Sequence, residues 1–74
     1  MTMDRLGTGQ TGRVLQVRGA GAFRRRLLEL GVLPGTLVVR TGQAPLGDPL
    51  SFRIRGAVLC LRRDQAAAIE VESE

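Results

Sequence analysis

The hydrophobic and polar residues of the chain follow short alternating patterns that are typical of β-strands. The clearest is PLSFRIRG (49–56), in which Leu50, Phe52 and Ile54 share one face while polar residues occupy the other. Four further segments are rich in aliphatic and β-branched residues and are bounded by glycine, proline or charged residues. They are TGRVLQVRG (11–19), the turn and strand PGTLVVRTG (34–42), AVLCLRR (57–63), and IEVE (69–72), with Ile69 and Val71 inward. The pattern predicts five short strands.

One segment, AFRRRLLELG (22–31), has helical spacing instead. Its apolar residues recur at i, i+4, i+5 and i+7 and form one stripe that can pack on a sheet: Phe23, Leu27, Leu28 and Leu30. Gly31, followed by Pro34, marks the end of the helix. We therefore predict one α-helix over about residues 21–31.

Two shorter turns of helix are expected. In TMDRLGTGQ (2–10), Met3 and Leu6 lie three residues apart and are predicted to cover one end of the core. In DQAAA (64–68), Asp64 is the predicted N-cap.

Five short strands and one inserted helix in 74 residues predict a single, mostly β domain (1–74) that closes into a small barrel. Closure requires the first and last strands to pair. This pairing would bring Arg13 and Arg18 close to Glu70 and Glu72, so part of the positive charge is expected to be used inside the molecule.

The composition narrows the environment and the partners. All 11 basic residues are arginine, and the net charge of +4 favours an acidic partner. A single cysteine, Cys60, excludes an internal disulfide framework. No apolar run reaches the roughly 20 residues of a membrane span, and Met1–Arg5 does not resemble a signal peptide. We expect a soluble, cytoplasmic protein.

The residue types argue against catalysis and against a metal site. Histidine is absent, and one thiol does not make a zinc-type ligand set. Cys60, Ser51 and Ser73 lack a neighbouring base, and the glycines near the amino terminus do not form a phosphate-binding motif. We predict no catalytic, cofactor-binding or metal-binding residue and no enzyme activity.

Three segments carry a resemblance to a known family. FRRRLLELGVLPGTLV (23–38), APLGDPLSFRIRG (44–56) and LCLRRDQAAAIEVE (59–72) resemble, in the same order, the ferrous iron transport protein A (FeoA) family. The resemblance implies an SH3-like barrel with an inserted helix. It also implies a cytoplasmic protein that regulates or supports the membrane GTPase transporter FeoB in bacterial Fe(II) uptake through protein contact. Because the chain has no histidine and no cysteine cluster, we expect it neither to hold iron itself nor to use a cofactor.

The loop QAPLGDPL (43–50) is the first candidate for that contact. Its backbone needs proline, glycine and aspartate, but turn chemistry does not require Leu46 between Pro45 and Pro49. Leu46 is either an interface anchor on a stiff support or a residue that folds back over the end of the barrel, and the sequence does not separate these alternatives.

The arginines at 24–26 are the second candidate. They lie near the start of the predicted helix, where cations oppose the helix dipole, although Arg25 can pair with Glu29 at i+4. The simpler interpretation, a solvated helix face whose arginine stems cover core neighbours, is slightly favoured.

The strand AVLCLRR is the third candidate. If Leu59 and Leu61 point inward, Val58 and Cys60 point outward, where the FeoA family usually has polar residues. An apolar patch there would permit weak self-association. We favour instead a reversed register, or a strand that the helix also covers.

The leading hypothesis is a FeoA-like module that binds FeoB. Leu46, with Pro45 and Pro49, supplies the apolar contact, and charged residues complement it; the full predicted partner-binding set is Pro45, Leu46, Gly47, Asp48, Pro49, Arg24, Arg25 and Glu29. One alternative is a nucleic-acid-binding barrel that uses Arg53 and Arg55, but exposed aromatic residues for base stacking are not expected, so we predict no nucleic-acid partner. The other is an SH3-like regulatory domain of an iron-dependent repressor, against which the lack of a helix-turn-helix argues.

Overall fold

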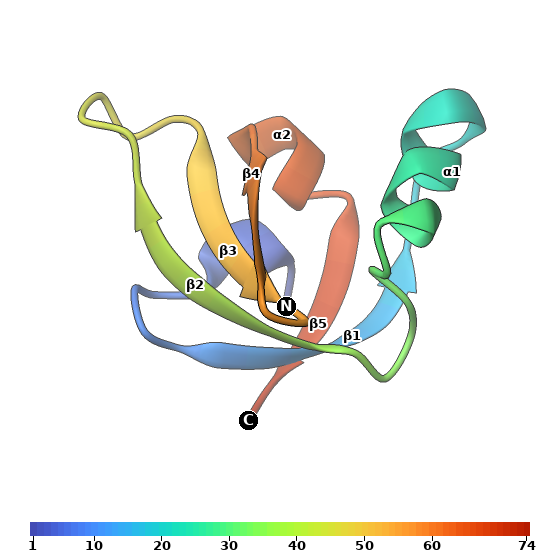
Figure 1. Ribbon diagram of the computed structural model, residues 1–74, viewed down its shortest axis with the longest axis horizontal. Helices are drawn as coiled ribbons and strands as arrows, with labels where there is room; N and C mark the ends of the chain where they lie inside the picture. The colour runs from blue at the N-terminus through green and yellow to red at the C-terminus, as the bar shows by residue number, and fades with distance from the viewer.

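The computed structural model describes residues 1–74 and contains one strongly curved antiparallel sheet (Figure 1). Its order is β4-β3-β2-β1-β5, so β4 and β5 are the two edges of a partly open barrel. The strands are β1 (Thr11–Val17), β2 (Leu37–Gln43), β3 (Leu50–Ile54), β4 (Ala57–Leu61) and β5 (Ile69–Ser73). The helices are the 3₁₀ turn η1 (Met3–Arg5), α1 (Gly21–Glu29) and α2 (Arg63–Ala66). The predicted five-stranded, mostly β architecture is confirmed.

The core lies inside the curved sheet and is almost entirely aliphatic. Alternation along β3 buries its three apolar residues and leaves Ser51 and Arg53 outside, as predicted. Met3 and Leu6 are fully buried and cover one end of the core. The complete cluster is Met3, Leu6, Val14, Val17, Leu27, Val32, Val38, Leu50, Phe52, Ile54, Leu61, Ala66, Ile69 and Val71.

Helix α1 ends at Glu29, two residues before the predicted end, and the predicted glycine stop follows its C-cap in the left-handed region. Gly31 has φ +93°, and its N–H donates to the carbonyl of Leu28 at 3.1 Å. The N–H of Val32 donates to the carbonyl of Leu27 at 2.9 Å, and both of these side chains are buried. This is the double hydrogen bond of a Schellman motif with its hydrophobic contact, and it turns the chain from α1 toward β2.

The predicted apolar stripe of α1 is only partly correct. Leu27 is buried, but Phe23 and Leu28 are half-buried and Leu30 is 47% exposed. The helix packs at one end of the molecule (Figure 1). Leu27 belongs to the core cluster, and Phe23 packs against it. The predicted ion pair between Arg25 and Glu29 is not formed. Both residues are exposed, and a surface pair of this kind gains too little to fix two long side chains.

A two-residue turn joins β3 to β4. Arg55 and Gly56 have φ values of 53° and 81°, and Ile54 pairs with Ala57. Positive φ at both central positions defines a type I′ turn, whose twist matches that of the strands it joins. Strand β3 therefore ends at Ile54, one residue before Arg55, which the sequence pattern had included in the strand.

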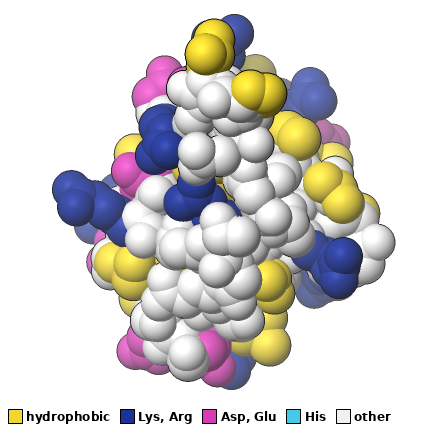
Figure 2. All heavy atoms as spheres, turned by 90° about the vertical axis from the view of Figure 1, so that its left-hand side faces the viewer, with side chains coloured by type: hydrophobic (Ala, Val, Ile, Leu, Met, Phe, Trp, Pro, Cys, Tyr) yellow, Lys and Arg dark blue, Asp and Glu magenta, His cyan; other side chains and the backbone are white.

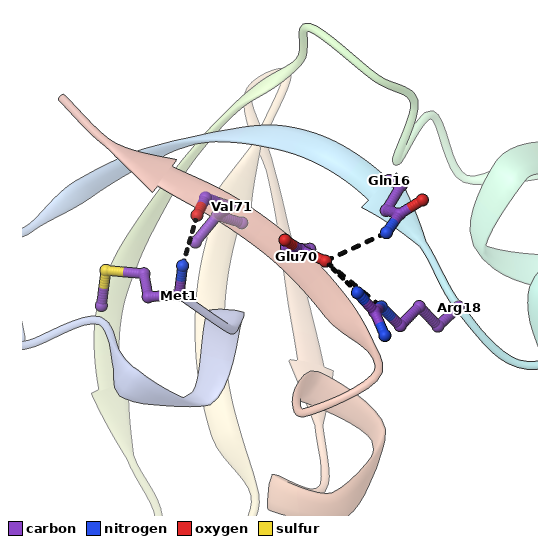
Figure 3. A network of polar contacts seen from close by, with 5 residues as sticks. All are labelled: Met1, Gln16, Arg18, Glu70 and Val71. Carbon is purple, nitrogen blue, oxygen red and sulfur yellow. Dashed lines mark hydrogen bonds and ion pairs between the residues drawn. The ribbon is translucent and has the colours of Figure 1, made fainter.

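The pairing of β1 with β5 was predicted, and it is present together with its charges (Figure 3). Arg18 contacts Glu70 at 2.6 Å, and Gln16 also donates to Glu70, at 3.0 Å. Arg13 contacts Glu74 at 3.1 Å, although Glu72 is its partner in the strand register. The expected pair with Glu72 is thus replaced by one with Glu74, which directly follows β5.

The chain start covers the outer edge of β5. The ammonium group of Met1 donates to the carbonyl of Val71 at 3.1 Å, and the N–H of Val71 donates to the carbonyl of Met1 at 2.8 Å (Figure 3). Thr2 forms an isolated bridge with Glu70. Of the two sheet edges, β5 is therefore partly paired.

One arginine belongs to the core, which the sequence did not indicate. Arg40 of β2 is only 8% exposed. Its Nη1 donates to the carbonyl of Leu6 at 2.6 Å, and its Nη2 donates to the side chain of Gln43. Its backbone also bonds to Gly9 and Gln10. Arg40 therefore holds the segment before β1 against β2 through oxygen acceptors of Leu6 and Gln43 instead of a carboxylate, while its buried Nε has no partner.

We predict that Arg40→Ala lowers the free energy of unfolding by about 2–4 kcal/mol, because it leaves a cavity and removes the donor to Leu6. Arg40→Met keeps most of the side-chain volume and should cost about 1–2 kcal/mol. Urea denaturation of both variants measures the difference. Equal losses in the two variants would show that the hydrogen bonds, and not the packing, account for the effect.

A second prediction concerns pH. Hydrogen bonds from Gln16 and from Arg18, together with the charge of Arg18, lower the pKa of Glu70 below its ordinary value of 4.5. A carboxylate with a lowered folded-state pKa stabilises the fold above the unfolded value, and this stabilisation is lost as the pH falls through the folded value. The Tm of the wild type should therefore decrease from about pH 5 to about pH 3 more steeply than that of Glu70→Gln. Parallel Tm curves for the two proteins would contradict this assignment.

Candidate functional site

The loop between β2 and β3 presents the most exposed large apolar side chain of the molecule. Leu46 is 97% exposed, and it neither belongs to the core cluster nor packs against it. In Figure 2, which faces this side, hydrophobic side chains protrude at the upper end, with basic and acidic side chains beneath them. The alternative in which Leu46 folds back to cover the end of the barrel is therefore wrong.

Local turn chemistry explains why Leu46 points outward. The N–H of Gly47 donates to the carbonyl of Ala44 at 2.8 Å and closes a β-turn with Pro45 at its second position. The N–H of Ala44 donates to the carbonyl of Pro49 at 2.9 Å and closes the whole loop. Leu46 occupies the corner of the turn, where its side chain faces away from the loop backbone.

The loop is tied to α2 by one arginine. The Nε of Arg63 donates to the carbonyl of Gly47 at 2.7 Å, and the backbone N–H of Arg63 donates to the carboxylate of Asp48 at 3.0 Å. Asp48, 15 residues before Arg63 in the chain, therefore accepts a hydrogen bond from a backbone N–H in the first turn of α2. The predicted N-cap was wrong: Asp64 lies inside the helix, and the capping position is Arg62. Because four hydrogen bonds hold the loop, Leu46 is presented on a fixed support.

A basic side chain that the sequence analysis did not select lies beside the loop. Arg62 is exposed and, with Asp48 and Pro49, lines a shallow hollow of about 230 Å³. Its relation to the loop depends on contacts between residues 13 to 14 positions apart, so no local pattern could have indicated it. Leu46, Pro45, Pro49 and Arg62 define what we call the loop surface.

The predicted arginines of α1 do not belong to the loop surface. Arg24, Arg25 and Glu29 lie on α1, at the opposite end of the longest axis from the β2–β3 loop (Figure 1). The Nε of Arg24 donates to the carbonyl of Val17 at 3.2 Å and so ties α1 to the end of β1. The structure thus separates the residues that the sequence grouped, and Arg24 has a structural contact.

The structure shows which side chains of β4 face the core and which face outward. Leu61 is buried and Leu59 half-buried, whereas Val58 is 65% exposed and Cys60 is exposed. The reversed register and the covered strand that we favoured are both wrong. Beside β4 lies a mainly apolar groove of about 180 Å³ between this strand and α1.

The structure contains no group of three or more histidine, cysteine, aspartate or glutamate side chains placed to hold a metal ion. None of its helices has the length and apolar character needed to cross a bilayer.

Comparisons with known proteins place the chain in one family. Residues 1–73 match the FeoA domain. Over 72 residues, 97% of the chain, the sequence is 42% identical to the Fe(2+) transport protein A/Fe(2+) transporter FeoB fusion protein of Porphyromonas gingivalis. The chain spans only 8% of the length of that relative.

Solved structures agree on the fold. The FeoA protein from Chlorobium tepidum is 36% identical, with a TM-score of 0.93 over 99% of this chain and 70% of that one. FeoA from Stenotrophomonas maltophilia, solved with zinc and described as a prokaryotic SH3 domain protein, is 29% identical, with a TM-score of 0.87 over 97% and 89% of the two chains. The SH3-like fold is thus confirmed. A manganese-dependent transcriptional repressor shares the fold alone, at 21% identity, with a TM-score of 0.86 over 100% of this chain and 41% of that one.

We predict that Arg63→Ala loosens the loop without unfolding the protein, because it removes the side-chain bond to Gly47. Amide hydrogen exchange of Gly47 should become faster by about fivefold or more. The neighbouring Arg62→Ala is the matched control, since no hydrogen bond of the Arg62 side chain to the loop is present, and it should leave this rate within about twofold. An unchanged Gly47 rate in Arg63→Ala would mean that the turn is held by its own backbone bonds.

Proposed function

The chain belongs to the FeoA family, and we propose that it supports bacterial ferrous iron uptake as a small binding module for the cytoplasmic part of the transporter FeoB. The loop surface makes the contact, and Leu46 is its anchor. The module acts in the cytoplasm, beside the membrane that holds the transporter. It contributes protein contact and no chemistry of its own.

The observation that carries this proposal is the 97% exposure of Leu46 on a turn held by hydrogen bonds. An exposed leucine on a mobile loop would lose conformational freedom on binding, but here most of the ordering is already done by folding. Burying a leucine side chain in a partner pocket contributes about 1.5–3 kcal/mol. A leucine anchor on a preorganised support is therefore suited to a specific contact.

The charge near the anchor indicates what the partner face should look like. Arg62 is exposed beside the loop, while Asp48 is already bound to the backbone of α2. The loop surface is thus apolar at its tip and basic at its rim. It matches a partner that offers an apolar pocket next to carboxylates, and charge of this kind mainly favours the encounter and its specificity.

Two further observations support a transporter partner over a nucleic acid. In the Porphyromonas gingivalis relative, transport protein A and FeoB are fused, and such a linkage keeps two binding partners at high effective concentration. In the present chain, Phe52 is buried and Phe23 half-buried, so neither of its two aromatic rings is offered for base stacking.

We predict that Leu46→Asp reduces retention of this chain by the immobilised cytoplasmic part of its FeoB by about tenfold, because an anchor leucine is replaced by a charge. The Tm should stay within about 2 °C of the wild type, since the side chain is not packed. The measurement is a pull-down at moderate salt with purified proteins.

Leu15→Asp is the matched control, because Leu15 is 44% exposed on β1, away from the loop. It adds the same charge and should retain binding. Equal losses in both variants would mean that added negative charge, and not the leucine, is responsible. Full retention of Leu46→Asp would remove the loop surface from the contact, and no retention of the wild type would refute direct binding to that domain.

A further inference from the structure

Strand β4 is an unpaired sheet edge with free backbone groups. It pairs only with β3, and Ile54 with Ala57, Phe52 with Leu59 and Leu50 with Leu61 stand opposite one another in the register. In an antiparallel ladder that starts from a two-residue turn, these pairs exchange the hydrogen bonds, and the residues between them direct N–H and C=O outward. Val58 and Cys60 are those residues, and neither makes a backbone hydrogen bond to any loop or helix.

The other edge of the sheet, β5, is partly covered by the first residues of the chain, whereas β4 is not. Met1 and Thr2 pair with the outer side of β5. Nothing comparable lies on β4, and the edge carries no proline or inward-pointing charge of the kind that usually blocks edge-to-edge pairing. The backbone of β4 is therefore available to an added strand.

An apolar groove follows the same edge. It lies between β4 and α1 and has a volume of about 180 Å³. Phe23, Leu27 and Leu30 line it from α1, and Leu59 and Leu61 line it from β4. Leu30 and Leu59 are not fully buried, so this space is an unfilled part of the core boundary that side chains of an added strand could occupy.

The charged residues near β4 indicate which kind of added strand would bind there. No carboxylate lines the groove, whereas Arg26 does. On the outer face, Arg53 stands opposite Val58 in the register and is exposed. A second copy of this chain, added through its own β4, would offer these arginines no carboxylate from its groove. An acidic segment would be attracted at both positions.

We propose that β4 is a docking edge for an extended acidic segment of a partner protein, in which apolar and acidic residues alternate. Its backbone pairs with Val58 and Cys60. Its apolar side chains enter the groove beside Leu59, and its acidic side chains lie on the outer face near Arg53, with the charge of Arg26 at the groove adding to the attraction. This is strand addition, in which main-chain bonds provide affinity and alternate side chains provide specificity. The surface is distinct from the loop surface, and the proposal does not depend on FeoB being the partner.

The test uses the full chain and a defined probe, a nine-residue blocked peptide of alternating valine and glutamate. NMR-detected amide exchange should show slower exchange at Val58 and Cys60 on peptide addition, while Leu59, already bonded to β3, stays unchanged. A peptide of alternating valine and lysine should bind at least about tenfold more weakly, because it meets the same arginines. Fluorescence anisotropy gives the affinities.

Two variants separate the backbone from the charge. Val58→Pro removes an outward donor without breaking a bond to β3, a substitution that edge strands tolerate, and it should weaken peptide binding by about tenfold. Arg26→Glu should weaken it by about fivefold. Arg25→Glu carries the same charge change one residue away, outside the groove, and should stay within about twofold of the wild type.

Each other outcome would overturn the proposal. Equal binding of both peptides would show that the sheet edge does not select acidic partners. Protection of Leu59 along with Val58 and Cys60 would indicate general stabilisation and not edge pairing. Concentration-dependent dimerisation of the wild type that Val58→Pro abolishes would make a second copy the occupant. If Val58→Pro did not fold, the comparison of Arg26→Glu with Arg25→Glu would still decide the matter.

Discussion

The pairing of β1 with β5 is the contact on which the rest of the structure depends. It joins residues more than fifty positions apart, and without it β1 would be a sheet edge and the core would lose Ile69 and Val71. Its cost in chain entropy is repaid only when the whole barrel forms, which is the usual reason for cooperative folding of small β domains. Arg13 and Gln16 on β1, and Arg18 directly after it, meet acidic side chains on or directly after β5, so charge supports the same pairing as the register.

The arginines show why a basic composition does not by itself identify a partner. Arg40 lies in the core and bonds to oxygen atoms of Leu6 and Gln43. Arg24 ties α1 to the carbonyl of Val17 at the end of β1, and Arg63 ties α2 to the carbonyl of Gly47 in the β2–β3 loop. Several of the positive charges are therefore part of the fold, and those left for a partner lie on separate surfaces, Arg62 beside the loop and Arg26 beside the groove. The planar guanidinium group suits all these contacts because it offers several donors in fixed directions.

The two proposed interaction surfaces use different physics. The loop surface offers a side chain and depends on preorganisation, since the turn is held before a partner arrives. The β4 edge offers backbone groups and an apolar groove, and its selectivity comes from the surrounding arginines. Both can exist on a domain of this size because a barrel with a few short strands leaves loops and an edge outside its core.

The sequence alone determined the five strands, the helix with its glycine stop, the buried residues of β3 and the pairing of β1 with β5. The strands, the helix and the buried residues follow from the periodicity of neighbouring residues. The pairing of β1 with β5 follows from the closure that five short strands in one small domain require. It did not determine that Arg40 is buried or that Leu30 is exposed. Nor did it determine that Asp48, and not Asp64, accepts a hydrogen bond from the first turn of α2. It also grouped Leu46 with Arg24 and Arg25, although the fold places them at opposite ends of the molecule. Each of these depends on which segments meet after the sheet curves. Whether a side chain lies near a distant carbonyl, a groove or a free sheet edge depends on contacts between segments that are far apart in the sequence. The spacing of residues along the chain does not predict these contacts.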